Sequence, residues 1–389
     1  MTERAKSPEP ASRRALVPDR PPPRLLFNFT AYDALASGAR ERALGLCGAL
    51  LELGAEVIVA EARGSDLAGL LPEGVRSVRT PLDPGRPLER FRRSRAVFES
   101  ILRIEAPDAF VTDFYPVPRA PVTRTVVTVH DLRDLSGAAP RRPLRRAYFA
   151  AAYGRTLRRA DLVVTPSAFT RDEAVERLGV DPARTAVVPN AVSDALREPA
   201  DGARTRERLD LPRRPYLLAL GVLEERKNLA TLLAALRLLQ EGHVSIPALV
   251  IAGRGGPEER RLRRLAEGLP VHWAGYIRPA DLPAVYAGAR ALVHPATYEG
   301  FGMPVVEAMA AGIPVACADA SALPETAGGA ALLFDPLDPR SVADGCLTVC
   351  NDETVRAGLV RLGRARAAGL TWDAAARSLL DSLGLAVPA

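Results

Sequence analysis

Two glutamates, Glu299 and Glu307, flank a glycine-broken turn that leads from a short apolar run into a helical segment. Pro304 and Gly312 predict where this helix begins and ends, because proline is favoured in the first helical position and glycine just past the last. Carboxylates placed this way could bind hydroxyl groups on either side of a phosphate. They could equally be acidic side chains at an ordinary helix start.

The turn itself is predicted to be a phosphate site. Its last three residues precede the helix, so their backbone N–H groups should point out of the helix N-terminus, where anions bind favourably. One glutamate could then reach a sugar hydroxyl and the other a ribose, with a diphosphate between them. The three residues are Phe301, Gly302 and Met303.

Adjacent cations at Arg226 and Lys227 follow another apolar run and precede a helical segment that starts at Asn228. A departing diphosphate needs its developing charge neutralised, and two cations could do this without a metal ion. The chain has no Asp-x-Asp motif of the kind that holds a divalent metal, and Lys6 is its only other lysine. A lysine at this position suggests a need for a compact, point-like charge. A solvated charged turn is the alternative, and these two residues alone favour it.

His130 ends a buried apolar run and precedes Asp131, at the carboxyl end of a predicted strand. Ligands of open α/β sheets bind at that end, so His130 is a candidate for ligand contact through its ring or its backbone carbonyl. A lone histidine is more often structural. His243, His272 and His294 are predicted to be surface or strand-packing residues.

The run 295–315, which carries both glutamates, resembles the signature of retaining nucleotide-sugar glycosyltransferases of the GT-B fold, in glycosyltransferase family four. The resemblance is strong over 216–342, moderate over 126–192 and weak before that. Within these stretches the matching segments are 221–229, 249–256, 272–277 and 323–336 in the second half, and 129–132 and 187–192 in the first.

The resemblance implies a role for each candidate residue. Glu307 would bind the ribose and Glu299 the sugar hydroxyls of a nucleotide sugar. The diphosphate would be held by Arg226, Lys227 and the amides of 301–303, although relatives often have arginine where this chain has Val222. His130 would contact the donor sugar and assist reaction, Tyr276 would join the donor-binding set, and Gly38 would contact a phosphate or the acceptor.

Composition agrees with a two-domain α/β protein. The 389 residues are enough for two cores, and the 48% apolar and 25% charged fractions are typical of soluble proteins. No apolar run approaches the length of a membrane span. The four scattered cysteines form no zinc pattern, so we expect reduced thiols in a cytoplasmic protein. A net charge of +6 suits anionic small molecules or an anionic membrane surface, and without a nucleic-acid motif it does not indicate DNA or RNA.

Apolar runs alternate with helical segments, and six strands are expected in each half, which is typical of parallel α/β units. The resemblance implies the GT-B fold, with two doubly wound Rossmann-like domains that face each other across a cleft. We expect a disordered tail (1–23), an acceptor-binding domain (24–195), a linker (196–215), a nucleotide-sugar-binding domain (216–368) and a helix that crosses back (369–389).

The expected function is a metal-independent retaining glycosyltransferase without a cofactor. It would move a hexose from a nucleotide-diphosphate sugar to a hydroxyl of a saccharide, lipid-linked or natural-product acceptor. Segments 223–228 and 298–302 most resemble mannosyl- and rhamnosyltransferase-like members, so GDP-mannose is the first donor expected. An inactive GT-B partner subunit and a GT-B phosphorylase or epimerase are the alternatives.

Two other motifs carry less weight. Segment 253–258 has Glu258 where the nicotinamide-binding fingerprint needs its third glycine, which disfavours a dehydrogenase. The basic, amphipathic segment 88–102 could place the protein peripherally on the inner membrane face. More often such a helix packs on its own sheet with a solvated basic face.

Overall fold

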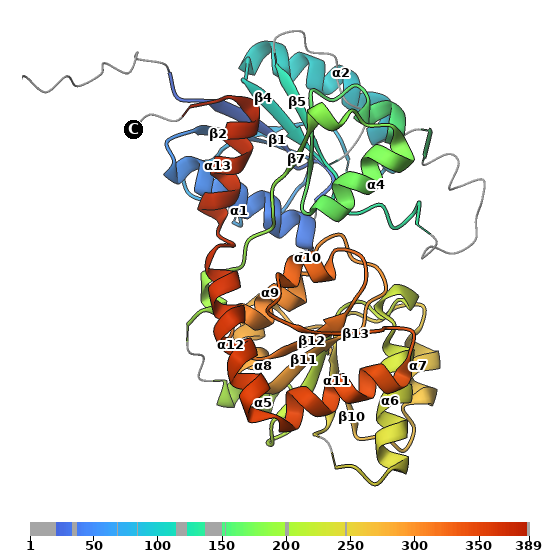
Figure 1. Cartoon of the computed structure of the whole chain (residues 1–389). Coiled ribbons are helices and arrows are strands. Elements are labelled where there is room, and N and C mark those ends of the chain that lie inside the picture. The colour runs from blue at the N-terminus through green and yellow to red at the C-terminus, as the bar shows by residue number, and fades with distance from the viewer. Residues whose placement is uncertain are drawn as a thin grey trace, which may run out of the picture.

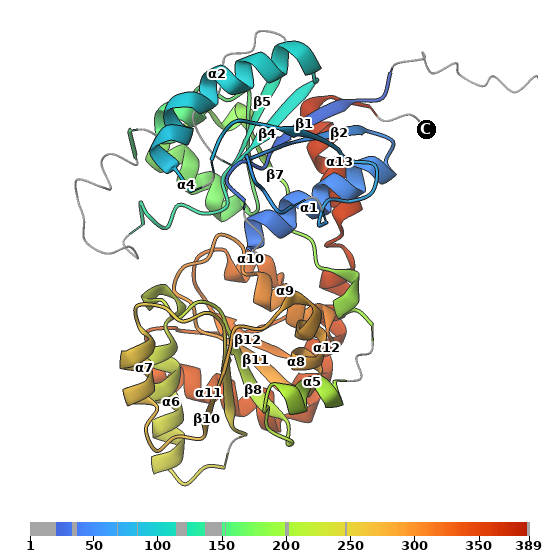
Figure 2. The same ribbon diagram turned by 180° about the vertical axis from the view of Figure 1, so that it is seen from behind.

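The computed structural model describes residues 21–32, 37–67, 69–83, 85–113, 123–136, 150–151, 153–198, 202–245 and 247–386. Within these ranges the chain forms two parallel sheets of seven and six strands. Each sheet has helices on both faces and makes its own lobe (Figures 1 and 2). The predicted fold class, two doubly wound Rossmann-like domains, is confirmed. The tail expected at 1–23 lies almost wholly outside the described residues.

The N-terminal sheet has the strand order β3-β2-β1-β4-β5-β6-β7, and every neighbouring pair is parallel. Six of its strands were expected. The seventh, β3, is largely exposed and polar, so it has no apolar signal in the sequence. The elements are β1 (Arg24–Asn28), α1 (Gly38–Glu52), β2 (Glu56–Glu61), β3 (Arg76–Arg79), α2 (Pro87–Glu105), β4 (Ala109–Thr112), β5 (Arg124–Thr128), β6 (Leu162–Thr165), α4 (Ala168–Leu178) and β7 (Thr185–Val187).

Successive side chains of β1 point to opposite faces of the sheet, as strand geometry requires. Leu25 and Phe27 pack toward α1, whereas Leu26 packs toward α2. On α2, Phe98 and Leu102 are buried against this sheet, so the amphipathic segment covers its own domain. Both faces of the sheet are therefore closed by helices, and the edge at the carboxyl ends of the strands remains for ligands.

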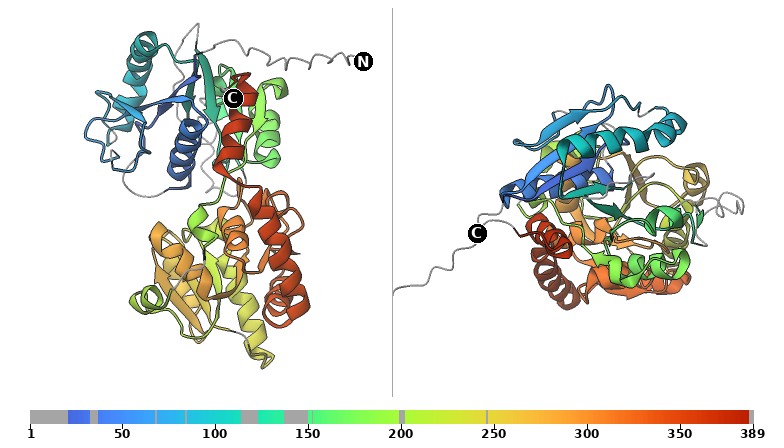
Figure 3. Two further views of the ribbon diagram at one scale, coloured as in Figure 1. Left: turned by 90° about the vertical axis from the view of Figure 1, so that its left-hand side faces the viewer. Right: turned by 90° about the horizontal axis from the view of Figure 1, so that it is seen from above.

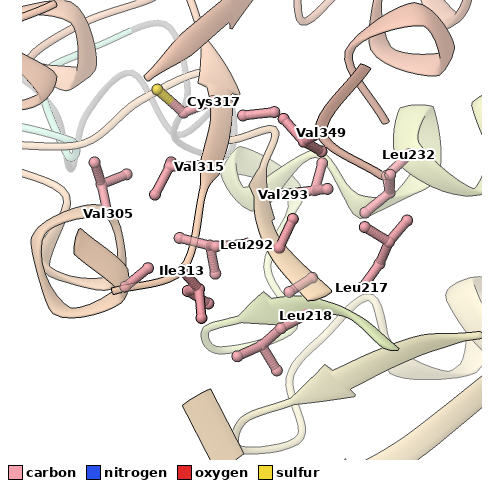
Figure 4. Close-up of a cluster of buried hydrophobic side chains, with 14 of the residues drawn as sticks. Leu217, Leu218, Leu232, Leu292, Val293, Val305, Ile313, Val315, Cys317 and Val349 are labelled. Atoms are coloured by element: carbon pink, nitrogen blue, oxygen red, sulfur yellow. The ribbon is translucent and has the colours of Figure 1, made fainter. Parts of the chain in front are cut away.

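The C-terminal sheet has the order β10-β9-β8-β11-β12-β13, also parallel throughout. Its strands lie in one continuous core with the surrounding helices (Figure 4). The elements are α5 (Ala203–Arg208), β8 (Tyr216–Leu220), α6 (Leu229–Glu241), β9 (Leu249–Ala252), α7 (Glu259–Leu265), β10 (Val271–Gly275), α8 (Leu282–Gly288), β11 (Ala289–His294), α9 (Met303–Ala310), β12 (Val315–Ala318), α10 (Leu323–Ala327), β13 (Leu332–Phe334), α11 (Pro339–Asn351) and α12 (Glu353–Ala368).

The last helix, α13 (Trp372–Leu383), leaves the C-terminal lobe and lies along α1 in the other lobe (Figures 1 and 3). Its apolar face, which includes Leu379, Leu380 and Leu383, is part of the N-terminal core. The other crossing lies before the segment expected to be a linker, because Val188 packs in the N-terminal core whereas Val192 and Leu196 pack in the C-terminal core. The expected linker, which holds α5, therefore belongs to the C-terminal lobe, where Leu211 is also buried. Two segments of the chain thus join the lobes.

Two further features concern membrane-spanning helices and the cysteines. Among the described residues, no helix combines the length and the apolar character that a membrane crossing requires. Each of the four cysteines is buried and free.

Candidate functional site

A cleft of about 800 Å³ opens between the lobes, at the carboxyl ends of both sheets. Strand-end loops of each domain line it, as the topology of doubly wound sheets requires. It brings together all but one of the ten residues predicted from sequence. Those that line it are Gly38, His130, Arg226, Lys227, Tyr276, Glu299, Phe301, Gly302 and Met303; Glu307 does not.

Glu299 is the centre of a charged cluster in the loop between β11 and α9. Its Oε1 accepts hydrogen bonds from Lys227 Nζ and, at 3.1 Å, from His294 Nε2. Its Oε2 lies 3.1 Å from an Arg226 guanidinium nitrogen. Only 12% of the Glu299 side chain is exposed. Two residues that are distant in sequence, Arg226 and Lys227, and one at the end of β11, His294, therefore converge on one carboxylate.

The cluster keeps this carboxylate ionised. Burial alone would raise the pKa of Glu299, but Lys227, His294 and Arg226 together hold it well below its usual range. Burial has the opposite effect on its partner, lowering the pKa of the His294 imidazole, with a further contribution from Lys227. His294 is therefore a neutral donor to an ionised Glu299 near neutral pH.

Lys227 lies across the first turn after β8. The exposed fraction of its side chain is 9%. Gly221 makes room for it, since a Cβ at Gly221 would stand 2.7 Å from Lys227 Cε and 3.0 Å from Nζ. The φ of Gly221 is +144°, a conformation that side-chain-bearing residues rarely adopt. Gly221, which begins the matching segment 221–229, is thus needed to make room for the lysine.

Arg226 has a different set of contacts from Lys227. Its guanidinium donates to Glu224 at 2.9 Å, to the Tyr298 carbonyl at 3.2 Å and to Glu299 at 3.1 Å. These bonds tie the loop after β8 to the loop after β11. Arg226 therefore positions the Glu299 loop as well as adding positive charge to the cleft.

Glu307, one turn into α9, lies behind the cleft surface. Its carboxylate accepts a 2.7 Å hydrogen bond from the hydroxyl of the fully buried Tyr286 on α8. Burial raises the pKa of Glu307 and raises that of Tyr286 well above its usual range. Tyr286 was not predicted as a site residue, because a tyrosine inside an apolar helix gives no sign of what its hydroxyl contacts.

His130 follows β5 on the opposite wall of the cleft. Its Nε2 lies 2.7 Å from Asp113 Oδ2, beyond the end of β4, and 28% of its side chain is exposed. Its backbone carbonyl abuts the C-terminal lobe, since a Cβ at Gly300 would come within 2.0 Å of it. The ring and the carbonyl of His130 were both considered as ligand contacts. The ring is partly exposed, whereas the carbonyl lies in a close contact between the lobes.

The Glu299 loop also holds the two lobes together. The Gly300 carbonyl accepts hydrogen bonds from Ser167 at 2.7 Å and Thr170 at 3.1 Å, at the start of α4. Beside it, the Tyr298 hydroxyl accepts from the Leu132 amide at 3.0 Å and donates to the buried Glu173. The position of Glu299 is therefore linked to the position of the N-terminal domain.

A second polar contact between the lobes lies at the N-terminus of α4. The Glu325 carboxylate, from α10, accepts hydrogen bonds from the amides of Ala168 at 2.7 Å and Phe169 at 3.1 Å. A carboxylate suits this position because it meets unpaired helical N–H groups and the positive end of the helix dipole.

Tyr276 and Arg254 form the far wall of the cleft in the C-terminal domain. The Arg254 guanidinium lies over the Tyr276 ring at 5.0 Å from its centroid. Tyr276 is 43% exposed, which leaves a flat apolar surface on this wall. Such a surface suits a planar heterocycle.

His294 was expected only to pack or to face solvent, and this prediction was incomplete. The residue is buried at the end of β11, but its ring contacts Glu299 directly. Its position at a strand's carboxyl end, five residues before Glu299, is the signal that could have found it. Among the described residues, no group of three or more His, Cys, Asp or Glu side chains could hold a metal ion.

Comparisons with known proteins agree with the architecture and the cleft. The family model described as Glycosyl transferases group 1 matches residues 203–366, and the one described as Glycosyltransferase Family 4 matches residues 36–196. A sucrose-phosphate synthase from Thermosynechococcus elongatus superposes with a TM-score of 0.73 at 22% identity, over 92% of this chain and 98% of that one. This likeness shows the fold.

Two relatives share more sequence. An O-antigen chain mannosyltransferase B from Escherichia coli is 33% identical over 257 residues, which cover 64% of this chain and 67% of that protein. A GDP-mannose-dependent alpha-(1-6)-phosphatidylinositol dimannoside mannosyltransferase from Mycobacterium tuberculosis is 31% identical over 268 residues, or 68% of each protein. With the two domains facing across one cleft, these matches show that the chain belongs to the GT-B glycosyltransferases described as group 1 and Family 4.

Proposed function

We propose that this glycosyltransferase is a metal-independent, retaining hexosyltransferase whose donor is a nucleotide-diphosphate sugar, with GDP-mannose as the first candidate. The convergence of Lys227, Arg226 and His294 on the ionised Glu299 carries the proposal. Two relatives, both mannosyltransferases and one of them GDP-mannose-dependent, support the choice of donor.

In this proposal each wall of the cleft has its own task. The diphosphate lies against Lys227, Arg226 and the start of α9, where cations and helix amides neutralise the charge that grows as the glycosidic bond breaks. Glu299 accepts hydrogen bonds from the sugar hydroxyls, for which an ionised, acceptor-only carboxylate is suited. The base lies on Tyr276. Glu307, which is only partly buried and whose Oε2 is bonded to Tyr286, binds the ribose through Oε1.

The acceptor enters from the N-terminal wall, near Gly38 and His130. We propose a hydroxyl of a saccharide, lipid-linked or natural-product acceptor. It attacks the sugar on the face from which the diphosphate leaves and gives up its proton to the departing diphosphate, so that the anomeric configuration is retained. No enzyme nucleophile is required. A peripheral position on a membrane, which the exposed arginines of α2 would favour, is part of the proposal for a lipid-linked acceptor.

The test begins with thermal-shift screening against GDP-, UDP- and dTDP-sugars, since a ligand that binds only the native state raises its apparent stability. We expect GDP-mannose to give the largest shift. Transfer to candidate acceptors is then measured, and the anomeric configuration of the product is compared with that of the donor by NMR.

Two variants test the site. Lys227→Ala and Glu299→Ala should each lower kcat/KM by about 100-fold or more, the order of loss found when one group that stabilises the transition state is removed. Glu353→Ala, which removes an exposed carboxylate at the start of α12, is the matched control and should have no effect. Normal transfer by both site variants would refute the assignment. Donor binding without turnover in any assay would instead favour an inactive partner subunit. Phosphate-dependent cleavage of a glycoside, or epimerisation of the donor, would favour a phosphorylase or an epimerase.

A further inference from the structure

A carboxylate lies directly behind the one histidine of the N-terminal wall. Asp113 follows β4, and 10% of its side chain is exposed. It is not among the residues that line the cleft, whereas His130 is. The 2.7 Å contact between Asp113 Oδ2 and His130 Nε2 therefore connects the cleft to a polar group in the domain interior.

The carboxylate is itself held in place. The Tyr32 hydroxyl donates to the same Oδ2, and Thr128 on β5 adds a side-chain hydrogen bond. Burial alone would raise the pKa of Asp113, but His130, Tyr32 and Thr128 hold it below its usual range. An ionised carboxylate can only accept hydrogen bonds, so the proton of this contact belongs to His130 Nε2.

Arg42 on α1 places a positive charge near the negative charge of Asp113. It is 3% exposed, and burial lowers its pKa to about 10, an effect that the charge of Asp113 opposes. Arg42 is thus cationic near neutral pH beside an anionic Asp113. It also donates a 2.5 Å hydrogen bond to Asn190, another residue of the cleft wall.

We propose that Asp113 is a positioning residue for His130, whose carboxylate, anchored by Tyr32 and Thr128, fixes both the orientation and the tautomer of the imidazole at the cleft wall. In its neutral form the ring then carries its proton on Nε2. Nδ1 is left as the acceptor nitrogen toward a hydroxyl of donor or acceptor. This inference rests on the proposed function only for the identity of that hydroxyl.

The experiment uses Asp113→Asn in the full chain. The amide keeps the size of the side chain but can present either an oxygen or an NH₂ group to Nε2, so the tautomer is no longer imposed. The chain has four histidines, and ¹⁵N-histidine labelling therefore gives few ring signals. The His130 signals are assigned by their loss in His130→Gln.

We expect Asp113→Asn to shift His130 away from the Nε2–H form. It should lower kcat by about 10- to 100-fold, the order of loss for a misplaced active-site group. Because Asp113 does not touch the donor, KM for the nucleotide sugar should stay within about threefold. Glu61→Gln is the matched control. It neutralises a carboxylate of the same sheet that is 5% exposed and bonded to Ser77, and it should change neither the tautomer nor kcat.

Tyr32→Phe is the second variant, in case Asp113→Asn does not fold. It removes one anchor of the carboxylate and should give smaller changes in the same direction. An unchanged His130 tautomer, or a changed tautomer with unchanged kcat, would overturn the proposal. Absence of transfer by the unsubstituted protein would refute the proposed function instead, and the tautomer measurement would still decide the role of Asp113.

Discussion

Gly300→Ala tests whether the contact between the lobes positions the catalytic groups. A Cβ at Gly300 would stand 2.0 Å from the His130 carbonyl oxygen and 2.9 Å from Asp131 Cβ. Ordinary contact begins near 3.4 Å, so one backbone segment must retreat by about 1.4 Å. Neither neighbour can swing aside, because the first is a backbone atom and the second is attached directly to the backbone.

The displacement falls between two candidate catalytic residues. Glu299 precedes Gly300 on one wall and His130 lies on the other, so the retreat widens the distance between them. A misplacement of about 1 Å can cost on the order of 100-fold in rate, and we expect a loss of that size in kcat/KM. The free energy of unfolding should fall by about 1–3 kcal/mol, as for other overpacked sites.

The assay combines three measurements on purified Gly300→Ala: kcat/KM for transfer, the Kd of the nucleoside diphosphate, and urea unfolding. The Kd should stay within about threefold of the unsubstituted value, because the C-terminal domain holds the proposed diphosphate contacts. Gly358→Ala on α12 is the matched control, since a Cβ there meets nothing within 4 Å. It should keep full activity and gain about 0.5–1 kcal/mol of stability. Gly300→Ala with unchanged kcat/KM would show that this contact does not position the site.

Three further predictions concern charge and the domain contacts. The pKa of Glu299 is depressed below 4.5, so its contribution to the free energy of unfolding is full above pH 4.5 and declines as the pH falls below it. Urea unfolding of Glu299→Gln should therefore differ most from the unsubstituted protein at neutral pH, and a constant difference down to about pH 3 would contradict this linkage. Tyr298→Phe should lower the free energy of unfolding by about 1–3 kcal/mol in the same assay, because the amide of Leu132 loses its partner and the carboxylate of Glu173 keeps only Arg177. An unchanged free energy of unfolding would mean that water replaces the hydroxyl. Glu325→Gln should lower the free energy of unfolding by about 0.3–1 kcal/mol, and by less at high salt, because it removes a negative charge from the N-terminus of α4. A loss that does not depend on salt would contradict an interaction with the helix dipole.

Much of the fold could be predicted because its signals are local. Apolar runs separated by helical segments predicted twelve strands, and the one missed, β3, is a polar edge strand. Pro304 and Gly312 placed the short helix near its observed limits, Met303–Ala310. Helix α10, which follows Leu323-Pro in a matching segment, was not predicted as a helix because five residues carry no clear period.

The candidate site was predictable to the extent that its residues lie at the carboxyl ends of strands. Nine of the ten predicted residues line the cleft, because parallel sheets gather these ends at one edge. Their roles remain predictions. What strand position could not show is which partner each side chain takes. Arg226 and Lys227 are neighbours in sequence, yet one ties two loops together and the other lies buried on Gly221.

The sequence by itself therefore determined the α/β layering, the two domains and the set of residues at the cleft. The layering depends on periodicity and turn residues, which act over short stretches of chain, whereas the facing domains and the candidate roles of Gly38 and Tyr276 followed from the family resemblance. Only the tertiary structure decided that His294 joins Glu299, that Asp113 holds His130 and that Gly300 touches the opposite lobe. Such pairings depend on distances of a few ångströms between segments far apart in the chain, or on side-chain direction at a strand end, and no local pattern encodes them. The charge state of Glu299 follows from those distances, because burial and three neighbours act on it together.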